Sequence, residues 1–476
     1  MKINIIQRFL TKEDGSKVTQ YLVVITATIT LFTAGIYQGW AGPSLLKILS
    51  EEYPIDVTAE EASYITIIGP VGHVIGGFSA SYLADYIGRK NTVLSIGIPQ
   101  VISFLLIYFS YHTVYLLYIA RILGGIGEGA SLALLPCYIA EVADPSVRGT
   151  LGTFVNLLLL FGQLFINTVG SFLTIHDTAM ICIIFPVVFW LTFAHMPESP
   201  YYCLMKKDVD GARRALQMLR RKNNVDKEVI QLSADVDRQM SEKGTYKDLF
   251  LIKSNRKAFL LVSATRIFQV FTGSIALMSY VQIMISQATE LSPVTGSTVL
   301  IVAGAIMVLT SSMYVDKFGR RPTLIVSALT TALSLLAQAL FLSLRDYTAL
   351  DLSSVSWLPL LIMIINYLSF RGGLGVVTNI FISEIYSTSI KAKAMSLGSL
   401  NFAIVMIIST KMYQLTADYV GLAVPFYIFA FTTFASVLFF YFVLPETKGK
   451  TLEVIQQELK GNAKNENDDN DNGLSV

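Results

Sequence analysis

Twelve long apolar segments dominate this chain, and each is long enough to cross a lipid bilayer. A membrane-spanning helix needs about 20 consecutive, mostly apolar residues. Only 15% of the residues are charged and 53% are hydrophobic, whereas soluble domains carry roughly a quarter of charged residues. We therefore predict an all-α membrane protein with spans at residues 21–42, 62–82, 92–110, 114–140, 150–172, 178–196, 257–286, 295–315, 322–344, 355–383, 394–417 and 422–444.

Lys and Arg gather in the segments that lie on one side of the predicted membrane. Of the 36 basic residues, 30 fall in these segments, and segments rich in Lys and Arg stay in the cytoplasm. Both termini are therefore predicted to be cytoplasmic. The predicted organisation is an N-terminus 1–20, a six-helix half 21–196, a cytoplasmic helical linker 197–256, a second six-helix half 257–444 and a cytoplasmic tail 445–476.

Three motifs of the first half recur in the second half at a nearly constant offset. "DYIGRK" at Asp85 recurs as "DKFGRR" at Asp316, an offset of 231 residues. "EVADPSVRG" at Glu141 matches "EIYSTSIKA" at Glu384, an offset of 243, and the offset from "PES" to "PET" is 248. Such parallel repeats relate the two halves of major-facilitator transporters. We therefore expect two pseudo-symmetric halves of six helices.

The motifs together resemble the sugar porter family of the major facilitator superfamily. The resemblance is carried by "GGFSASYLADYIGRK", by the fourth-span signature from Arg121 to Gly149, and by "PESP", "DKFGRR" and "LPETKGKTLEVI". "PESPYYCLMK", and Lys411 before "MYQL", are most similar to the arthropod branch, which includes facilitated trehalose transporters. The resemblance covers almost the whole chain outside its termini. It implies a major facilitator fold and sugar transport by alternating access.

The charged motifs at the cytoplasmic helix ends are expected to act as gates. Charge-assisted pairs between these residues can hold helix ends together in one state and release them in another. The repeated glycine of the motif allows a tight turn. The expected gating residues are Asp85, Gly88, Arg89, Glu141, Arg148, Asp316, Gly319, Arg320, Arg321 and Glu384.

The positions that bind sugar in the family are only partly kept. The resemblance implies substrate binding by Asn156 and Gln163 in the fifth span, Gln269 and Thr272 in the seventh, and Asn379 in the tenth. Amides of the family pattern are replaced in the second half by Val270, Ile275 and Gly304. Each missing amide leaves a sugar hydroxyl unpaired, at a cost of about 1–3 kcal/mol. The second half therefore departs from an ordinary hexose site.

Two charges near the middle of spans are further candidates for the substrate site, because intramembrane charges are costly. Glu128 lies in "GIGEGA", which loosely matches a nucleotide-binding turn but sits inside a span, where its glycines suit close helix packing. Glu128 precedes Glu141 by 13 residues, and Arg371 precedes Glu384 by the same number. We hypothesise that Glu128 and Arg371 face each other across the cavity and pair in at least one state.

Alternatives to that pair remain open at this stage. His73, at a similar depth to Glu128, is a possible proton carrier with it, or each charge is satisfied within its own half. Arg266 and Lys411 are expected to extend towards the membrane surfaces.

The function predicted from these features is facilitative uniport of a sugar such as trehalose or a hexose. Proton-driven relatives resemble one another in an acid of the first span, which "GIYQGWAGP" lacks. The alternatives are a non-transporting nutrient sensor and a proton-coupled carrier of another polar solute. We expect no enzymatic activity, cofactor, metal or nucleic-acid partner. The expected surroundings are the lipid bilayer of the plasma membrane, with the protein working as a monomer on a small-molecule solute.

Overall fold

The computed structural model describes residues 15–241, 245–288, 291–348, 355–386, 390–450 and 452–460, and every regular element in these residues is helical. Twelve helical segments are long and apolar enough to span a membrane, which confirms the predicted all-α class. In the N-terminal half they comprise α2 (Val18–Gly39) with α3 (Ala41–Ile48), α4 (Ala59–Ile87), α5 (Arg89–Tyr108), α6 (Val114–Val142), α7 (Pro145–Phe172) and α8 (Ile175–Phe193).

The C-terminal half has the same number of spans, but two of them are broken. They comprise α13 (Lys253–Val270), α14 (Ser274–Ser279) and α15 (Val281–Ala288), then α16 (Pro293–Phe318), α17 (Arg320–Tyr347), α18 (Leu358–Gly372) with α19 (Leu374–Ile385), α20 (Lys391–Tyr419) and α21 (Ala423–Phe442). The seventh span was expected to be continuous. It breaks at Gly273, whose φ of +75° favours glycine and whose position leaves no room for a Cβ beside the Phe429 ring.

Tight turns separate the helices that carry the repeated motif. Gly88 joins α4 to α5 with a φ of +98°, and Gly319 joins α16 to α17 with a φ of +96°. A residue with a Cβ rarely adopts this conformation. The turn predicted from the repeated glycine is therefore present at the same place in both halves.

Helices α4 and α6 are in backbone contact through glycines of "GIGEGA". A Cβ added at Gly125 would lie 2.3 Å from the carbonyl oxygen of Gly69, and one at Gly129 would lie 1.9 Å from that of His73. Both distances are far below van der Waals contact, so a larger residue would force the helices apart. The close packing predicted for these glycines is confirmed.

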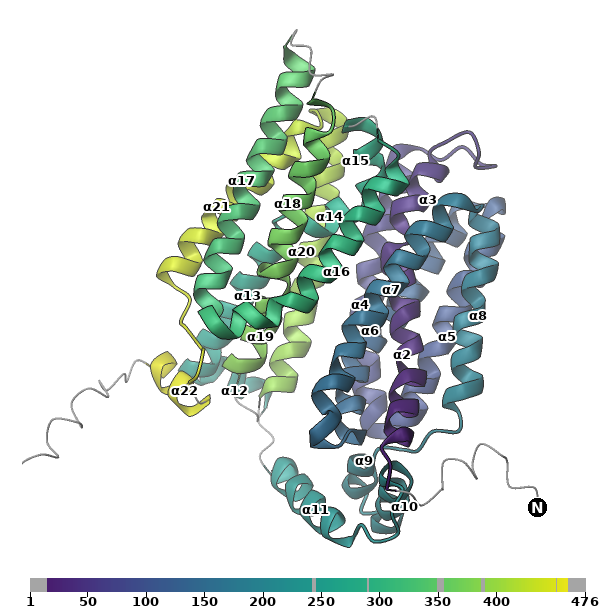
Figure 1. Ribbon diagram of the computed structural model, residues 1–476, viewed down its shortest axis with the longest axis vertical. Helices are drawn as coiled ribbons and strands as arrows, with labels where there is room; N and C mark the ends of the chain where they lie inside the picture. Colours follow the sequence, from purple (N-terminus) through teal and green to yellow (C-terminus); the bar gives the residue numbers. More distant parts are fainter. Residues whose placement is uncertain are drawn as a thin grey trace, which may run out of the picture.

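The linker folds into the short helices α9 (Pro200–Met205), α10 (Val209–Arg220), α11 (Asp226–Ser241) and α12 (Tyr246–Leu251). α9 and α10 contact the N-terminal half, whereas α12 contacts α13 and α20 of the C-terminal half. Buried apolar side chains on α9, α10 and α11 form a small core of their own. Gln20 of α2 donates a hydrogen bond to the Leu219 carbonyl, and Arg221 donates to Thr19 at 3.0 Å. The helices expected in this segment are present (Figure 1).

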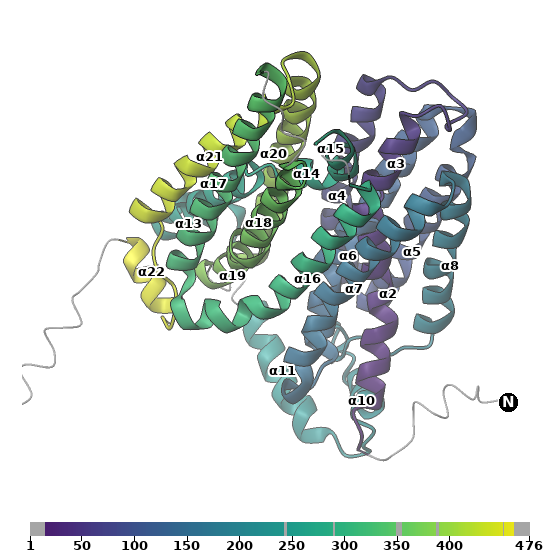
Figure 2. The same cartoon turned by 45° about the horizontal axis from the view of Figure 1, so that its top comes forward.

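The two halves lie side by side and meet at one end of the molecule. α9 to α11 and α22 (Leu452–Lys460) lie at the other end, which we call the linker end. At the far end, α3 contacts α15, α4 contacts α20 and α7 contacts α16. The ribbons of the halves diverge from this end towards the linker end (Figures 1 and 2). With the linker end predicted to be cytoplasmic, this is an inward-facing arrangement.

Candidate functional site

A polar network in the N-terminal half surrounds Glu128, which is only 8% exposed. Gln38 Nε2 donates a hydrogen bond of 3.1 Å to Glu128 Oε1, and His73 Nδ1 lies 3.7 Å from the same oxygen. Gln163 Nε2 in turn donates to Gln38 Oε1. One side chain each from α2, α4, α6 and α7 thus forms a single chain of contacts. Sequence reasoning missed Gln38, although an amide in the first span was a visible signal.

The amides of α7 continue this network towards both ends of the half. Asn156 is exposed and lies two turns from Gln163 in the direction of the linker end. Asn167, one turn beyond Gln163, bonds Thr298 of the other half at 3.0 Å. These three side chains share one face of α7 because they are spaced by seven and four residues. The face that holds the two predicted residues therefore looks towards the other half.

Arg121 has a packing role in the N-terminal half. Its guanidinium donates hydrogen bonds to the carbonyls of Ile65 and Tyr37, at 3.0 and 2.9 Å. It also lies 4.0 Å from the centroid of the Tyr37 ring, a cation–π contact. Backbone oxygens and an aromatic face thus stabilise its charge. The residue ties α2, α4 and α6 together.

In the C-terminal half, the two predicted sugar-binding amides hold an arginine. Arg266 Nη1 donates to Gln269 Oε1 and Nη2 donates to Asn379 Oδ1, each at 2.8 Å. Its guanidinium also lies 5.2 Å from the centroid of the Phe402 ring. The expectation that Arg266 extends to the membrane surface was wrong, because these contacts fix it between α13, α19 and α20. Thr272 is buried and donates to the Gln269 carbonyl of its own helix.

Arg371 makes its contacts within its own half. Its Nε donates a hydrogen bond of 3.0 Å to the Tyr367 hydroxyl, and its guanidinium lies 5.1 Å from the centroid of that ring. Glu128 is paired with His73, so the structure does not join the Glu128–Arg371 pair that we hypothesised. The physical reason is the arrangement of the halves, whose mutual contacts lie at the far end. Of the alternatives, the contact between His73 and Glu128 is the one present.

The expected gating residues of the N-terminal half form one cluster at the linker end. Arg89 pairs with Asp85 at 3.1 Å and with Glu141 at 3.3 Å. Glu141 also accepts a hydrogen bond from Ser199, and Glu198 accepts one from the Lys90 backbone N–H. Helices α4, α5 and α6 are thereby fastened to the start of the linker. The side chains of Arg148 and Asp316 lie outside the described part of the chain.

The C-terminal half repeats this cluster with equivalent residues. Arg320 pairs with Glu384 at 2.9 Å, and Thr447 Oγ1 donates to Glu384 at 2.6 Å. Arg321 Nε donates to the Phe440 carbonyl. Thr447 stands where Ser199 stands in the first half, at the 248-residue offset of "PES" and "PET". Sequence reasoning used that motif as a marker of the repeat and did not include its side chains in the gate.

Glu446 joins the second cluster by accepting hydrogen bonds from backbone N–H groups. Its carboxylate accepts N–H bonds from Arg320 and Arg321, each at 3.0 Å, and from Thr447 and Lys448, each at 2.9 Å. Partial burial acts to raise the pKa of Glu446, but these four donors outweigh it and hold the pKa below its usual value. The carboxylate therefore caps the start of α17.

Hydrogen bonds between the halves close the far end. Lys411 Nζ donates to Ser63 Oγ at 2.8 Å and lies 4.7 Å from the centroid of the Tyr64 ring. Gln282 Nε2 donates to Asn167 at 3.2 Å and to Ser171 at 2.8 Å. The expectation for Lys411 was wrong as well, because its ammonium bridges α20 to α4. Beside these polar contacts, apolar side chains of both halves share one buried cluster, in which Leu45 and Ala62 lie with Val281.

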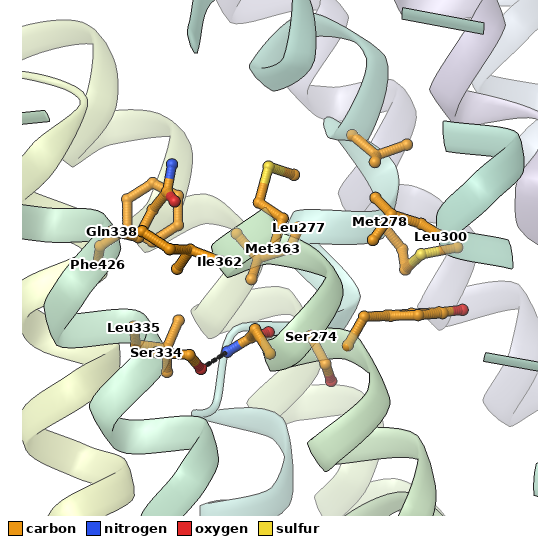
Figure 3. Close-up of a pocket in the computed structure, with 13 residues that line it drawn as sticks. Ser274, Leu277, Met278, Leu300, Ser334, Leu335, Gln338, Ile362, Met363 and Phe426 are labelled. Atoms are coloured by element: carbon orange, nitrogen blue, oxygen red, sulfur yellow. Dashed lines mark hydrogen bonds between the residues drawn. The ribbon is translucent and has the colours of Figure 1, made fainter. Parts of the chain in front are cut away.

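A small cavity of about 30 Å³ lies inside the C-terminal half (Figure 3). Its volume suits one or two water molecules, which is far less than a sugar needs. The Gln338 side chain, 2% exposed, reaches it without a hydrogen-bond partner among the described residues. Much of its lining is apolar. Residues that line it include Ser274, Leu277, Met278, Ser334, Gln338 and Phe426.

Comparisons with known proteins agree with this architecture. The family described as "Sugar (and other) transporter" matches residues 12–459. The facilitated trehalose transporter Tret1 of Bombyx mori is 28% identical over 445 residues, which cover 93% of this chain and 87% of that protein. Tret1 of Aedes aegypti is 29% identical over 450 residues, which cover 93% of this chain but about half, 55%, of that longer protein.

Solved structures share the fold. The inward open conformation of the xylose transporter XylE from E. coli superposes with a TM-score of 0.76 at 20% identity, over 93% of this chain and 99% of that one. A crystal structure of a D-xylose-proton symporter gives a TM-score of 0.72 at 20% identity, over 92% of this chain and 100% of that one. At this identity the likeness shows the fold alone.

Proposed function

Because the chain belongs to the sugar (and other) transporter family, in the sugar porter branch of the major facilitator superfamily, we propose that it is a facilitative carrier of a sugar such as trehalose or a hexose. The observation that carries the proposal is the asymmetry of the inter-half contacts. Hydrogen bonds join the halves at the far end, while the ribbons diverge towards the linker end. A carrier that works by alternating access needs such a closed end and an open end.

The gate clusters support rocking of the halves as two bodies. Arg89 with Glu141, and Arg320 with Glu384, fasten helices within one half and do not bridge the halves. The far-end closure combines hydrogen bonds with one buried apolar cluster that both halves share. Opening it breaks these contacts between the halves, while the clusters within each half stay intact. This division suits a carrier whose halves move as two bodies.

Downhill transport is the mode that we propose. The first span, α2 with α3, carries no Asp or Glu. We also propose that the protein lies in the plasma membrane as a monomer with both termini in the cytoplasm, on the strength of the basic residues at the linker end.

The test is flux through purified protein in liposomes. Labelled trehalose and glucose should equilibrate without a proton gradient, and saturating unlabelled trehalose should accelerate exit of the labelled sugar. Protein-free liposomes serve as the control. Sugar binding without flux would overturn the carrier and favour the nutrient-sensor alternative.

A second candidate, a proton-coupled carrier, is favoured by the contact between His73 and Glu128. The pair contacts Gln38, which in turn contacts Gln163, so protonation of the pair would change the hydrogen bonds of these two amides. Coupling predicts that sugar uptake acidifies the liposome lumen and that His73→Gln abolishes this acidification. Sugar equilibration with an unchanged lumen pH would exclude it.

A further inference from the structure

The C-terminal half carries two arginines in the middle of broken spans. Arg266 lies near the centre of the seventh span, Lys253–Ser279, and Arg371 near the centre of the tenth, Leu358–Ile382. Among the described residues, neither forms an ion pair with a carboxylate; their partners are amides and a tyrosine. A charge at this depth is costly unless a counter-charge compensates it. The half therefore holds positive charge that its own described side chains do not neutralise.

The surroundings of Arg266 are built to hold a cation in place. Both oxygens that Gln269 and Asn379 present are turned to its guanidinium. The amide nitrogens are engaged too, since Gln269 donates to the Leu374 carbonyl at 2.9 Å and Asn379 to the Gly375 carbonyl at 3.0 Å. The two amides that family resemblance assigns to sugar hydroxyls are thus occupied. Their hydrogen bonds orient an arginine instead.

Arg371 is fixed next to the same structural break. Gln269, which holds Arg266, bonds the carbonyl of Leu374, three residues after Arg371. Tyr367 engages Nε of Arg371 and covers one face of its guanidinium. Arg371 precedes Glu384 by 13 residues, as Glu128 precedes Glu141. By this count Arg371 is the sequence equivalent of Glu128, with the break between α18 and α19 lying between Arg371 and Glu384.

Other arginines of the chain show how neighbouring groups compensate the charge of a guanidinium. Arg121 is surrounded by backbone carbonyls and two aromatic rings. Arg345, at the far end of α17, pairs with Asp346 at 2.7 Å and donates to the Gln287 carbonyl. Arg89 and Arg320 pair with glutamates. Guanidinium groups bind carboxylates strongly and with defined geometry, so Arg266 and Arg371, which form no ion pair with a carboxylate among the described residues, are suited to bind one from a solute.

The N-terminal half supplies groups suited to hydroxyls. Gln163 Oε1 is buried and accepts no hydrogen bond from a described residue, and Asn156 on the same helix face is exposed. An amide oxygen of this kind accepts a hydrogen bond from a sugar hydroxyl. The N-terminal half therefore offers groups for hydroxyl recognition, and the C-terminal half offers groups for anion recognition.

We propose that the substrate is a sugar acid, a polyhydroxylated solute whose carboxylate binds Arg266 and Arg371 while its hydroxyls bind the amides of α7. This inference rests on the proposed carrier function and narrows its substrate class. A bound carboxylate neutralises the positive charge of Arg266 and Arg371, and the solute that carries it becomes a shared ligand of both halves. Closure of the halves around it then brings the arginines and the α7 amides onto one molecule.

Glucuronate and glucose form a matched pair for the test, because they differ by one carboxylate. Uptake of each is measured in liposomes that contain the full-length protein, with the membrane potential set by potassium and valinomycin. We expect glucuronate to inhibit uptake of labelled sugar by half at a concentration at least tenfold lower than the concentration of glucose that has the same effect. Its uptake should rise when the lumen is made positive, because the solute carries a negative charge across.

Variants locate the anion site. Arg266→Gln and Arg371→Gln should each weaken glucuronate binding by roughly 10- to 100-fold, the scale of a lost charged hydrogen bond, and should weaken glucose binding less, because glucose has no carboxylate to lose its partner. Arg345→Gln, a matched loss of charge at the far end, should change neither. Arg266→Lys keeps the charge but cannot bridge Gln269 and Asn379, so it should recover only part of the affinity. Thermal unfolding of each variant checks that it is folded.

The possible outcomes distinguish the sugar-acid substrate from the proposed carrier function. Glucose or trehalose flux with neither uptake of nor competition by glucuronate overturns the sugar-acid substrate and leaves the sugar carrier standing. Glucuronate binding that is lost in both Gln variants, without flux of any solute, supports the anion site and overturns the carrier. Absence of binding and flux for all three solutes overturns both.

Discussion

The two halves of this protein are alike at the linker end and differ in the middle of the membrane. At the linker end, Arg89 with Glu141 and Arg320 with Glu384 make the same cluster twice. In the middle, the N-terminal half holds a carboxylate beside a histidine and two glutamines, and the C-terminal half holds two arginines. The repeat thus shares its mechanical parts, while the charged side chains in the middle of the spans have opposite sign in the two halves.

The largest effect that we expect comes from breaking the two clusters in turn. The exposed fractions of Arg89 and Glu141 are 7% and 11%, whereas those of Arg320 and Glu384 are 13% and 27%. Removing one partner of a buried ion pair costs about 3–5 kcal/mol, and less where water reaches the pair. Glu141→Gln should therefore lower the unfolding temperature in detergent clearly more than Glu384→Gln. Equal losses would show that the two clusters are equivalent in stability as well as in geometry.

The next effect concerns the far end, where the halves touch. Lys411→Met keeps most of the side-chain volume and removes the contacts with Ser63 and Tyr64. A hydrogen bond from a charged group is worth about 1.5–3 kcal/mol, so the outward-open population should rise by about tenfold or more. Spin labels at the exposed positions Asp56 and Val420 should report longer distances in the variant. An unchanged distance distribution would remove Lys411 from the closure.

A smaller effect distinguishes local from cross-cavity pairing of Glu128. In double-mutant cycles, residues in contact show coupling energies of about 0.5–3 kcal/mol, and distant residues add within about 0.5 kcal/mol. We expect Glu128→Gln with His73→Gln to fall in the first range, and Glu128→Gln with Arg371→Gln in the second. Unfolding in detergent provides the measurement. Recovery of stability by the exchange Glu128→Arg with Arg371→Glu would instead support the pair across the cavity.

The smallest effect is a pH dependence at Glu446. Because its pKa is lower in the folded protein than in the unfolded chain, its contribution to stability is present above the unfolded pKa of about 4.3 and is lost as the pH falls through the folded pKa. Wild type should therefore unfold at a higher temperature than Glu446→Gln at pH 7, and the gap should narrow on acidification below about pH 4. A gap that is independent of pH would mean that the charge of Glu446 contributes nothing.

The sequence predicted the parts of the fold that depend on length, period and charge. Span number, the two halves and the short linker helices follow from apolar runs and repeated motifs. The helix breaks at Gly273 and Gly373 were missed, because an apolar run looks the same whether its helix is continuous or broken. The pair of Glu128 and Arg371 is not formed in this conformation, where the alternative partner His73 lies next to Glu128. Repeat arithmetic places Arg371 at the equivalent depth, but which neighbour a side chain meets depends on helix rotation and on the conformational state.

Packing of α4 against α6 has a consequence for chemistry at Glu128. Gly129 contacts the backbone of His73, so α4 and α6 pack closely as one unit. The imidazole of His73 and the carboxylate of Glu128 lie next to each other on this unit. In the two-body motion proposed above, α4 and α6 would tilt together and the imidazole and the carboxylate would stay neighbours. In the proton-coupled alternative, a proton shared by the two groups would therefore move with this helix pair.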